Sequence, residues 1–267
     1  MNKNLYEELA VAEKFFLIAG PCVIENRDIT LNTAETLLCE TQKRNIKLVF
    51  KSSWKKANRT SLQSYTGPGI DEGLKILQEI KNSFDLPIIT DFHETQEAPI
   101  VAEVADILQI PAFLSRQTDL LIAAGSTNRI VNIKKGQFMA PEDMQSAAEK
   151  ITSSGNDKIL ICERGTSFGY HNLVVDFRSF SILQSLGYPV VYDVTHSLQQ
   201  PSAGITSGGT PQFIEMMARA AIATSKVRGL FIETHPKPES ALSDAASMLP
   251  LNRIGKLLDD CLQINNR

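Results

Sequence analysis

Cationic side chains that could bind an anionic ligand follow several short apolar runs of this chain. The guanidinium group of arginine binds phosphate or carboxylate through paired hydrogen bonds, and the ammonium group of lysine acts as a point charge. The cations in question are Lys51, Lys56, Arg59, Lys134 and Arg164. Because they lie in a chain that has more acidic than basic residues, they predict a local site for a small molecule with several phosphates or carboxylates.

A second set of residues could bind a metal ion. Cys22, His196, Glu233 and Asp244 offer one thiolate, one imidazole and two carboxylates. This mixture suits Mn²⁺, Fe²⁺, Co²⁺ or Zn²⁺, whereas Mg²⁺ and Ca²⁺ prefer oxygen ligands alone. The four residues lie far apart in the sequence, so spacing alone leaves a second interpretation open, in which Cys22 is a buried apolar residue.

The apolar runs indicate strands, and the segments between them indicate helices. The eight runs cover residues 15–20, 46–53, 87–93, 105–111, 129–136, 158–165, 189–196 and 229–235. Between them apolar residues recur at intervals of three and four, for example at 33–45, 72–84, 117–125, 141–151 and 210–227. Strands buried on both faces and joined by crossover helices pair in parallel, so the alternation predicts an α/β fold of the (β/α)8 TIM barrel type. An open doubly wound sheet is disfavoured because no GxGxxG motif follows the first run.

In such a barrel the chemistry takes place at the C-terminal ends of the strands. Each predicted strand ends in polar residues, which in chain order are Cys22 and Glu25, then Lys51, Lys56, Asn58 and Arg59, then Asp91 and His93, Gln109, Lys134 and Lys135, Glu163 and Arg164, Asp193 and His196, and Glu233 and His235. Their convergence on one mouth predicts a single binding site. Two segments rich in Gly and Pro, at 66–69 and 199–211, are predicted to be active-site loops.

Composition and charge limit the other classes of function. The 267 residues are 43% apolar and 21% charged, which predicts one folded domain over residues 1–267, with residues 1–14 as an N-terminal lead-in. A net charge of -3 argues against nucleic acid as a partner, and the apolar runs are too short for a membrane span. The first residues lack the pattern of a signal peptide, so we expect a cytoplasmic protein without disulfides, in which Cys39, Cys162 and Cys261 are buried packing residues.

Eight sequence blocks occur here in an order typical of one enzyme family. The blocks are IAGPCVIEN, FKSSWKKANRTS, TDFHE, ADILQIPAFLSRQTDLL, NIKKGQF, ERGTSFGYHNLVVDFRS, YDVTHSLQQP and FIETHPKPESALSDAASMLPL. Over residues 15 to about 263 the chain resembles the 3-deoxy-D-manno-octulosonate 8-phosphate synthase (KDO8P synthase) family. The resemblance implies a homotetramer of (β/α)8 barrels that condenses phosphoenolpyruvate with D-arabinose 5-phosphate and water in lipopolysaccharide biosynthesis, and releases inorganic phosphate.

The resemblance also implies roles for individual residues. Phosphoenolpyruvate would be held by Lys51, Gln109, Lys134 and Arg164, with Phe113 nearby, and arabinose 5-phosphate by Asn58, Arg59 and the hydroxyl of Thr60. The residues implied to take part in the chemistry are Lys56, Asp91, His93 and His196. Two positions depart from the family pattern, which has Ser at Thr60 and Asn or Asp at His171. The first change keeps a hydroxyl, and we interpret His171 as a tolerated loop residue.

The family has a metal-dependent and a metal-free branch. The metal-dependent enzymes have Cys in the first block and a DAxS-like segment near the end, and this chain has Cys22 and Asp244-Ala245-Ala246-Ser247. The resemblance therefore implies the metal-dependent branch, in which Cys22, His196, Glu233 and Asp244 bind a divalent ion of Zn, Fe, Mn or Co.

The sequence leaves three alternative functions. A 3-deoxy-D-arabino-heptulosonate 7-phosphate synthase would use erythrose 4-phosphate, but that family typically has Lys-Pro-Arg-Thr or Lys-Pro-Arg-Ser where this chain has Lys56-Ala57-Asn58-Arg59. An aldolase that forms an imine would use a barrel lysine such as Lys134. A barrel that binds a sugar phosphate without catalysis would have lost site residues, and none of the expected ones is missing.

Overall fold

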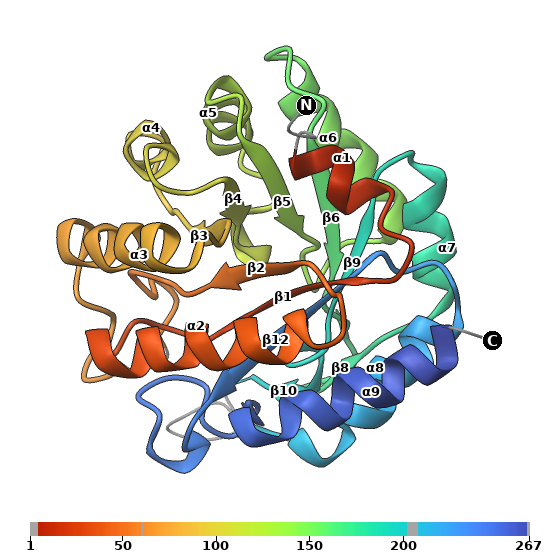
Figure 1. Ribbon diagram of the computed structural model, residues 1–267. Coiled ribbons are helices and arrows are strands. Elements are labelled where there is room, and N and C mark those ends of the chain that lie inside the picture. Colours follow the sequence, from red (N-terminus) through yellow and green to blue (C-terminus); the bar gives the residue numbers. More distant parts are fainter. Residues whose placement is uncertain (1–4, 60, 202–207, 266–267) are drawn as a thin grey trace.

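Eight parallel strands close into a barrel in the computed structural model, which describes residues 5–59, 61–201 and 208–265 (Figure 1). The barrel strands are β1 (Phe16–Gly20), β2 (Leu48–Lys51), β3 (Ile88–Asp91), β4 (Ile107–Ile110), β5 (Ile130–Lys134), β6 (Ile159–Glu163), β9 (Val190–Asp193) and β12 (Gly229–His235). They pair in this order, and β12 pairs with β1 to close the ring. The predicted (β/α)8 barrel is confirmed.

Helices connect the strands and cover the outside of the barrel (Figure 1). They are α2 (Arg27–Gln42), α3 (Ile70–Phe84), α4 (Glu97–Ala102), α5 (Thr118–Ser126), α6 (Met144–Thr152), α7 (Arg178–Ser185), α8 (Ile214–Ala223) and α9 (Ile254–Asn265). Helix α2 begins earlier than the apolar spacing predicted, because the Asn26 side chain caps it by accepting a hydrogen bond from the Ile29 amide at 2.9 Å. Helix α3 buries Leu74, Leu77 and Ile80 at the expected intervals of three.

Two apolar layers hold the barrel together. The larger one fills the space between the strands and the helices. The smaller one fills the barrel interior with alternate strand residues, among them Phe16, Ile18, Leu160 and Phe231. Helix α1 (Leu5–Ala10) adds Leu9 to this inner layer. The N-terminal end of the barrel is therefore packed with hydrocarbon.

Shorter elements occupy the connections. After β6, β7 (Thr166–Ser167) and β8 (Leu173–Val174) form an antiparallel hairpin, and β10 (Gln199–Gln200) pairs with β11 (Gly208–Gly209) after β9. Strand β13 (Leu249–Pro250) pairs with the end of β12. The short 3-10 helices are η1 (Ala112–Leu114), η2 (Pro141–Asp143), η3 (His196–Leu198), η4 (Pro211–Phe213), η5 (Pro238–Ser240) and η6 (Leu251–Arg253).

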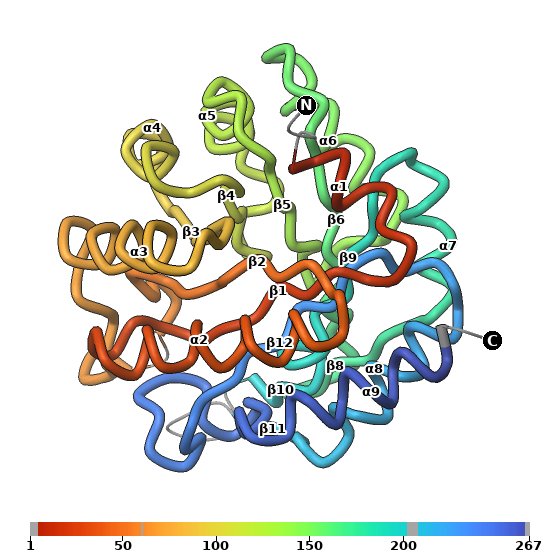
Figure 2. Tube along the Cα trace, viewed as in Figure 1, coloured from red at the N-terminus to blue at the C-terminus, as the bar shows by residue number. Residues whose placement is uncertain are grey.

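The first and last strands of the barrel lie side by side, and so do α2 and α9. Figure 2 shows β1 and α2 next to β12 and α9, in red and blue. Arg44, just after α2, binds both carboxylate oxygens of Asp259 on α9 at 2.7 Å, and it also binds Glu40 on α2. This ion pair joins the two helices that flank the closure of the barrel.

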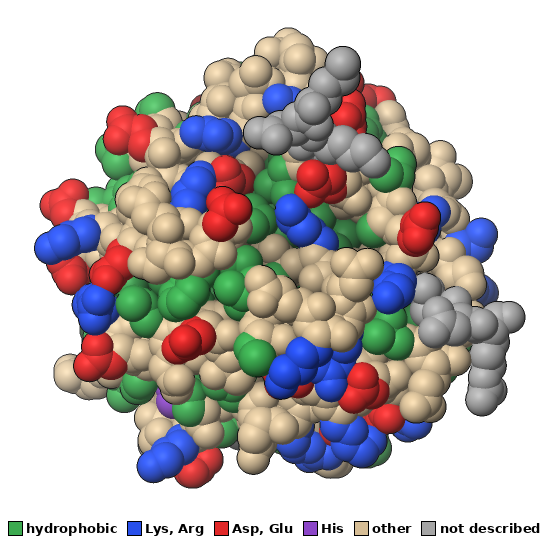
Figure 3. Space-filling view, in the orientation of Figure 1, with side chains coloured by type: hydrophobic (Ala, Val, Ile, Leu, Met, Phe, Trp, Pro, Cys, Tyr) green, Lys and Arg blue, Asp and Glu red, His purple; other side chains and the backbone are tan. Residues whose placement is uncertain are grey.

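The structure also bears on the expected burial of the cysteines, on disulfides and on membrane spans. Cys162 and Cys261 are buried as predicted, and all four thiols are free. The prediction for Cys39 was wrong: it is exposed, because α2 buries the face with Ala34 and Leu37 and Cys39 lies on the opposite face. No helix in the described ranges is long and apolar enough to cross a membrane. Figure 3 shows positive and negative side chains interspersed on the visible face.

Candidate active site

Two adjoining cavities lie at the C-terminal end of the barrel. An outer cavity of about 290 Å³ contacts Arg59, Gln199 and Asp244, and an inner one of about 160 Å³ contacts Asp91, His93 and Lys134. Six residues line both cavities: Lys56, Asn58, Phe113, Gln137, Arg164 and His196. The site therefore has room for two small molecules on either side of a shared wall.

The four candidate metal ligands come together beside the outer cavity. Cys22 Sγ lies 3.1 Å from Asp244 Oδ2, and ligand atoms of Cys22, Glu233 and Asp244 all lie within 4.8 Å of one another. His196 Nε2 lies 3.4 Å from Glu233 Oε2 and 3.6 Å from Asp244 Oδ2. Residues that are up to 222 positions apart in the sequence thus face one another.

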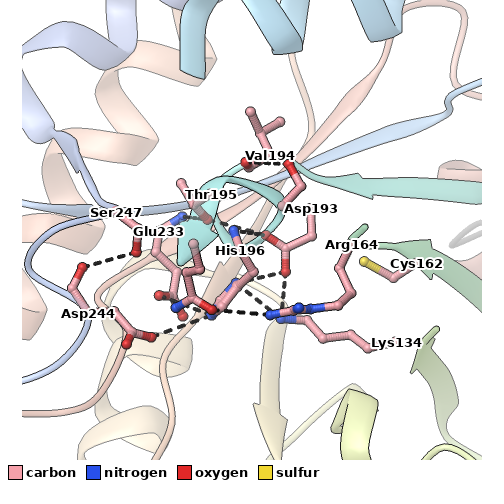
Figure 4. Close-up of polar contacts among 12 residues, drawn as sticks. Lys134, Cys162, Arg164, Asp193, Val194, Thr195, His196, Glu233, Asp244 and Ser247 are labelled. Carbon is pink, nitrogen blue, oxygen red and sulfur yellow. Dashed lines mark hydrogen bonds and ion pairs between the residues drawn. The ribbon is translucent and has the colours of Figure 1, made fainter. Parts of the chain in front are cut away.

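Local structure orients each of these side chains. Strand β1 ends at Gly20, two residues before Cys22. A Cβ at this position would lie 1.9 Å from the Lys51 carbonyl oxygen, so only glycine lets β1 and β2 lie this close together. Asp193 at the end of β9 accepts a hydrogen bond from the His196 amide at 3.0 Å and contacts His196 Nδ1 at 2.8 Å. The imidazole consequently presents Nε2 to the carboxylates (Figure 4). Asp244 has a left-handed backbone, with φ of 51°, which an Asp adopts more readily than most residues.

The electrostatics of the cluster fit a divalent cation. Glu233 Oε1 binds Lys51 Nζ at 2.5 Å, but the buried Glu233 Oε2 has no hydrogen-bond partner among the described residues. Burial raises the pKa of the Cys22 thiol, and the negative charges of Asp244 and Glu233 raise it further. A divalent cation would satisfy the free carboxylate oxygen and would stabilise the thiolate. The donor set therefore fits the transition metals that the sequence predicted.

Two cations that line the inner cavity differ in their partners. Lys134 Nζ lies 2.6 Å from Asp193 Oδ2 and 4.1 Å from the centre of the Phe231 ring. Arg164 donates from Nη2 to Gln199 Oε1 at 3.2 Å, but its buried Nη1 has no hydrogen-bond partner among the described residues. Burial lowers the pKa of Arg164. A buried guanidinium nitrogen without a partner is destabilising unless a ligand binds it, so Arg164 marks a site for an anion.

The outer cavity contains the remaining predicted sugar-phosphate residues. Arg59 donates to the Tyr65 carbonyl oxygen at 2.8 Å and to the Leu242 carbonyl oxygen at 2.9 Å. The amide of the same Leu242 donates to Glu25 Oε1 at 2.8 Å. The exposed Asn58 lines both cavities, and Thr60 lies outside the described residues.

A chain of buried hydrogen bonds fixes Asp91. Ser53 Oγ and Gln109 Nε2 each donate to one of its carboxylate oxygens, and Asn132 donates to Gln109 Oε1 at 3.0 Å. Burial opposes ionisation of Asp91, but Lys56 and Lys51 outweigh it and keep the pKa of Asp91 well below its usual value. Lys56 Nζ lies between two acids, 3.8 Å from Asp91 Oδ2 and 3.7 Å from Glu233 Oε1.

Of the four remaining predicted site residues, two lie behind the cavities and two line them. Lys51 and Gln109 are buried behind the cavities, where they bind Glu233 and Asp91. His93 lines the inner cavity, packs edge-on against Trp54, and has a pKa that burial lowers. Phe113 lines both cavities and is half exposed.

Three residues in or beside the cavities have no role in the sequence-based prediction. The sequence identifies Asp193 only as a strand-end acid, although its position three residues before His196 is a signal for a carboxylate that orients the imidazole. Gln137 and Gln199 line the outer cavity as uncharged amides and carry no comparable signal. Of the two predicted loops, 199–211 contributes Gln199 and Pro201 to the cavity, with residues 202–207 outside the described ranges. In the loop at 66–69, the Thr66 carbonyl oxygen binds the Lys56 amide at 2.7 Å.

Comparisons with known proteins identify relatives over nearly the whole chain. The model of the DAHP synthetase I family matches residues 11–265. A 2-dehydro-3-deoxyphosphooctonate aldolase of Syntrophotalea carbinolica is 53% identical over 250 residues, which cover 93% of this chain and 90% of that protein. The 2-dehydro-3-deoxyphosphooctonate aldolase 1 of Arabidopsis thaliana is 50% identical over 266 residues, which cover 97% of this chain and 91% of that protein. The chain therefore belongs to the DAHP synthetase I family and, within it, to the group of the 2-dehydro-3-deoxyphosphooctonate aldolases, which are the KDO8P synthases.

Proposed function

We propose that this protein condenses phosphoenolpyruvate with D-arabinose 5-phosphate and water to give 3-deoxy-D-manno-octulosonate 8-phosphate and inorganic phosphate. The observation that carries the proposal is the pair of adjoining cavities with separate cations, Lys134 in the inner one and Arg59 in the outer one. Arg164 stands in the wall between them with an unpartnered Nη1. Relatives about half identical in sequence are named for the same product.

The two substrates occupy the two cavities in this proposal. Phosphoenolpyruvate lies in the inner cavity against Lys134 and Arg164, beneath Phe113. Arabinose 5-phosphate extends into the outer cavity, with its phosphate on Arg59 and its hydroxyls near Asn58. The hydroxyl of Thr60, a residue outside the described ranges, is predicted to bind the sugar phosphate. Lys51 and Gln109 complete the phosphoenolpyruvate site from behind, through Glu233 and Asp91.

The chemistry needs charge stabilisation and proton transfer at the shared wall. The C2=C3 double bond of phosphoenolpyruvate supplies the electron pair for the new bond from C3 to the sugar aldehyde carbon. Water adds at C2 and loses a proton, which balances the one that the aldehyde oxygen takes up. The tetrahedral intermediate then loses phosphate by cleavage of the C–O bond, and the C2 hydroxyl gives its proton to the leaving phosphate as the ketone forms. Lys56 carries a proton between Asp91 and Glu233, at a position that both cavities reach, so it can donate to the oxygen of the aldehyde as negative charge develops there. His93 and Asp91 line the inner cavity beside this position.

We also propose that Cys22, His196, Glu233 and Asp244 hold a divalent transition metal. When bound, such an ion polarises an oxygen atom of the aldehyde or of the water. Glu233 Oε2, which faces His196 Nε2 at 3.4 Å without a hydrogen bond, and the mixed donor set support this assignment and the metal-dependent branch of the family. The homotetrameric state and the cytoplasmic location stay predictions.

One assay tests the proposed function. Phosphate release from phosphoenolpyruvate is measured with arabinose 5-phosphate and, separately, with erythrose 4-phosphate, each with and without a chelator. We expect release with arabinose 5-phosphate that the chelator abolishes and that added Mn²⁺, Co²⁺ or Zn²⁺ restores. Equal or faster release with erythrose 4-phosphate would overturn the choice of sugar in favour of the heptulosonate reaction. Covalent trapping by borohydride would instead indicate an imine on a barrel lysine.

A further inference from the structure

Two buried charged residues, Lys135 and Glu163, lie outside both cavities and outside the candidate metal cluster. Their side chains are 1% and 2% exposed, and Lys135 Nζ lies 3.4 Å from Glu163 Oε1. Desolvation makes a buried ion pair costly, so such a pair adds little stability compared with apolar residues of the same size. Its presence behind the substrate site therefore needs another explanation.

The pair lies directly behind the two cations of the inner cavity. Lys134 and Lys135 are consecutive residues at the end of β5, and Glu163 and Arg164 are consecutive residues at the end of β6. Successive residues of a strand point to opposite sides, which places Lys134 and Arg164 in the cavity and the other two away from it. The Lys135 amide donates to the Cys162 carbonyl oxygen at 2.8 Å, so β5 and β6 stay paired up to this point.

The Glu163 carboxylate holds the backbone of the turn that carries Arg164. Glu163 Oε1 accepts hydrogen bonds from the amides of Arg164 at 2.9 Å and Gly165 at 2.7 Å. Gly165 has a φ of 92°, a left-handed conformation that turns the chain toward the β7–β8 hairpin. Lys135 Nζ donates to Thr166 Oγ1 at 3.0 Å. Three successive residues of the turn are thus held from behind by two side chains.

The guanidinium of Arg164 depends on this turn because its own side-chain contacts are few. It donates to Gln199 at 3.2 Å, and its Nη1 is unpartnered. We propose that Glu163 and Lys135 are positioning residues for the anion subsite, which fix the Arg164 turn so that Nη1 faces the anionic substrate. The assignment of that anion as phosphoenolpyruvate rests on the proposed function. Small displacements of a positioning group are known to cost large factors in binding and rate.

Three variants and two probes test the proposal. Equilibrium binding of phosphoenolpyruvate and of inorganic phosphate is measured by calorimetry, alongside the KM for each substrate, the metal content and the melting temperature. We expect Glu163→Ala to weaken both anions at least tenfold and to raise the KM for phosphoenolpyruvate, with the KM for arabinose 5-phosphate changed less than twofold and the metal content unchanged. Glu163→Gln should restore most of the affinity, because its amide oxygen can accept the same two hydrogen bonds. Lys135→Met should give a smaller loss of affinity, because it frees Thr166.

A matched control exists at the N-terminal end of the barrel, where Asp106 precedes β4. Asp106 accepts a hydrogen bond from the Ile88 amide at 2.9 Å and pairs with Lys81 at 2.7 Å, so it repeats the arrangement of a carboxylate, a backbone amide and a lysine away from the cavities. Asp106→Ala should lower the melting temperature and leave the affinity for both anions unchanged.

The outcomes separate this inference from the proposed function. If the unmodified protein binds phosphate but not phosphoenolpyruvate, the proposed function is contradicted. The phosphate affinities of the variants would still show whether Glu163 and Lys135 position Arg164. Unchanged phosphate affinity in Glu163→Ala, with a lowered melting temperature like that of Asp106→Ala, would reduce the pair to a structural role. If Glu163→Ala does not fold, unchanged affinity in Lys135→Met has the same meaning.

Discussion

Cys22 is fully buried, yet it belongs to neither apolar layer of the barrel. Its sulfur lies 2.9 Å from the Ser243 hydroxyl oxygen and 3.1 Å from an Asp244 carboxylate oxygen. A thiol that served only to fill space would have hydrocarbon neighbours. The oxygen-rich surroundings favour the interpretation of Cys22 as a ligand over its interpretation as a packing residue.

Replacement of the thiol distinguishes these two interpretations. Cys22→Ala should lose most of the bound metal and most of the activity, because the soft ligand is gone, while the melting temperature of the metal-free protein stays close to that of the unmodified metal-free protein. Metal analysis and melting curves of both proteins check this outcome. Full metal content combined with a clearly lower melting temperature would mean that Cys22 is a packing residue.

The two arginines of the cavities should act on different substrates. Arg164→Ala should weaken phosphoenolpyruvate and Arg59→Ala should weaken arabinose 5-phosphate, each by about 1.5 to 3 kcal/mol for the loss of a charge-assisted hydrogen bond. Separate KM values and binding titrations for the two substrates measure this. Equal losses for both substrates in either variant would contradict the assignment of one arginine to each substrate.

At the scale of elements, strands were more predictable than their side-chain environments. Each barrel strand is buried on both faces, so its apolar run is visible in the sequence. Helix α8 begins at Ile214, later than predicted, because residues 211–213 form a 3-10 turn. The partners of a strand-end side chain cannot be read from the sequence, as Lys51 shows. It ends β2 as predicted, but behind the cavity its ammonium group binds Glu233, which lies 182 residues away in the sequence. Only the closed barrel brings such partners together.

The Arg44 contacts between α2 and α9 predict a pH-dependent contribution to stability. Hydrogen bonds from Lys43 and Arg44 lower the pKa of Glu40, and the hydrogen bond from Arg44 lowers the pKa of Asp259. Carboxylates with a lowered folded-state pKa stabilise the fold above their usual pKa values of 4.5 and 3.8, and this stabilisation disappears as the pH falls through the lowered values.

Arg44→Ala should therefore reduce the free energy of unfolding by about 0.5 to 1 kcal/mol at neutral pH, the usual size for a partly exposed ion pair. Urea unfolding at pH 7 and at about pH 3 measures the difference, which should shrink at the acidic pH. Catalytic constants should not change, since Arg44 is remote from the cavities. A difference that grows on acidification would contradict this account of the ion pair.

At the scale of the whole molecule, the chemistry is confined to one end of the barrel. Among the described residues, the inner apolar layer and Leu9 of α1 fill the other end, and the cavities lie at the mouth formed by the loops. The position of the site at the strand ends followed from the fold class alone. The division of the site into two cavities did not, because it depends on loop residues such as Phe113, Gln137 and Gln199.

The predicted homotetramer can be checked by mass. One chain has a mass of 29.5 kDa, so light scattering coupled to size exclusion should give about four times this value, or roughly 118 kDa. The mass should be the same with and without a chelator, because the four candidate ligands come from a single chain. A mass of one chain would show that the barrel acts as a monomer.

The backbone of Leu242 connects Arg59 with the segment that carries Asp244. Glu25 holds its amide, Arg59 holds its carbonyl oxygen, and Asp244 follows two residues later. A sugar phosphate that draws Arg59 away from Leu242 loosens the segment that carries a candidate metal ligand, so the two binding equilibria are thermodynamically linked. Linkage is reciprocal: whatever factor arabinose 5-phosphate imposes on the metal dissociation constant, the metal must impose on that of the sugar phosphate. The factor by which the sugar phosphate changes the metal dissociation constant should equal the factor by which the metal changes that of the sugar phosphate, and both should differ from one. In Glu25→Ala the Leu242 backbone loses one of its two anchors, so both factors should change by the same amount.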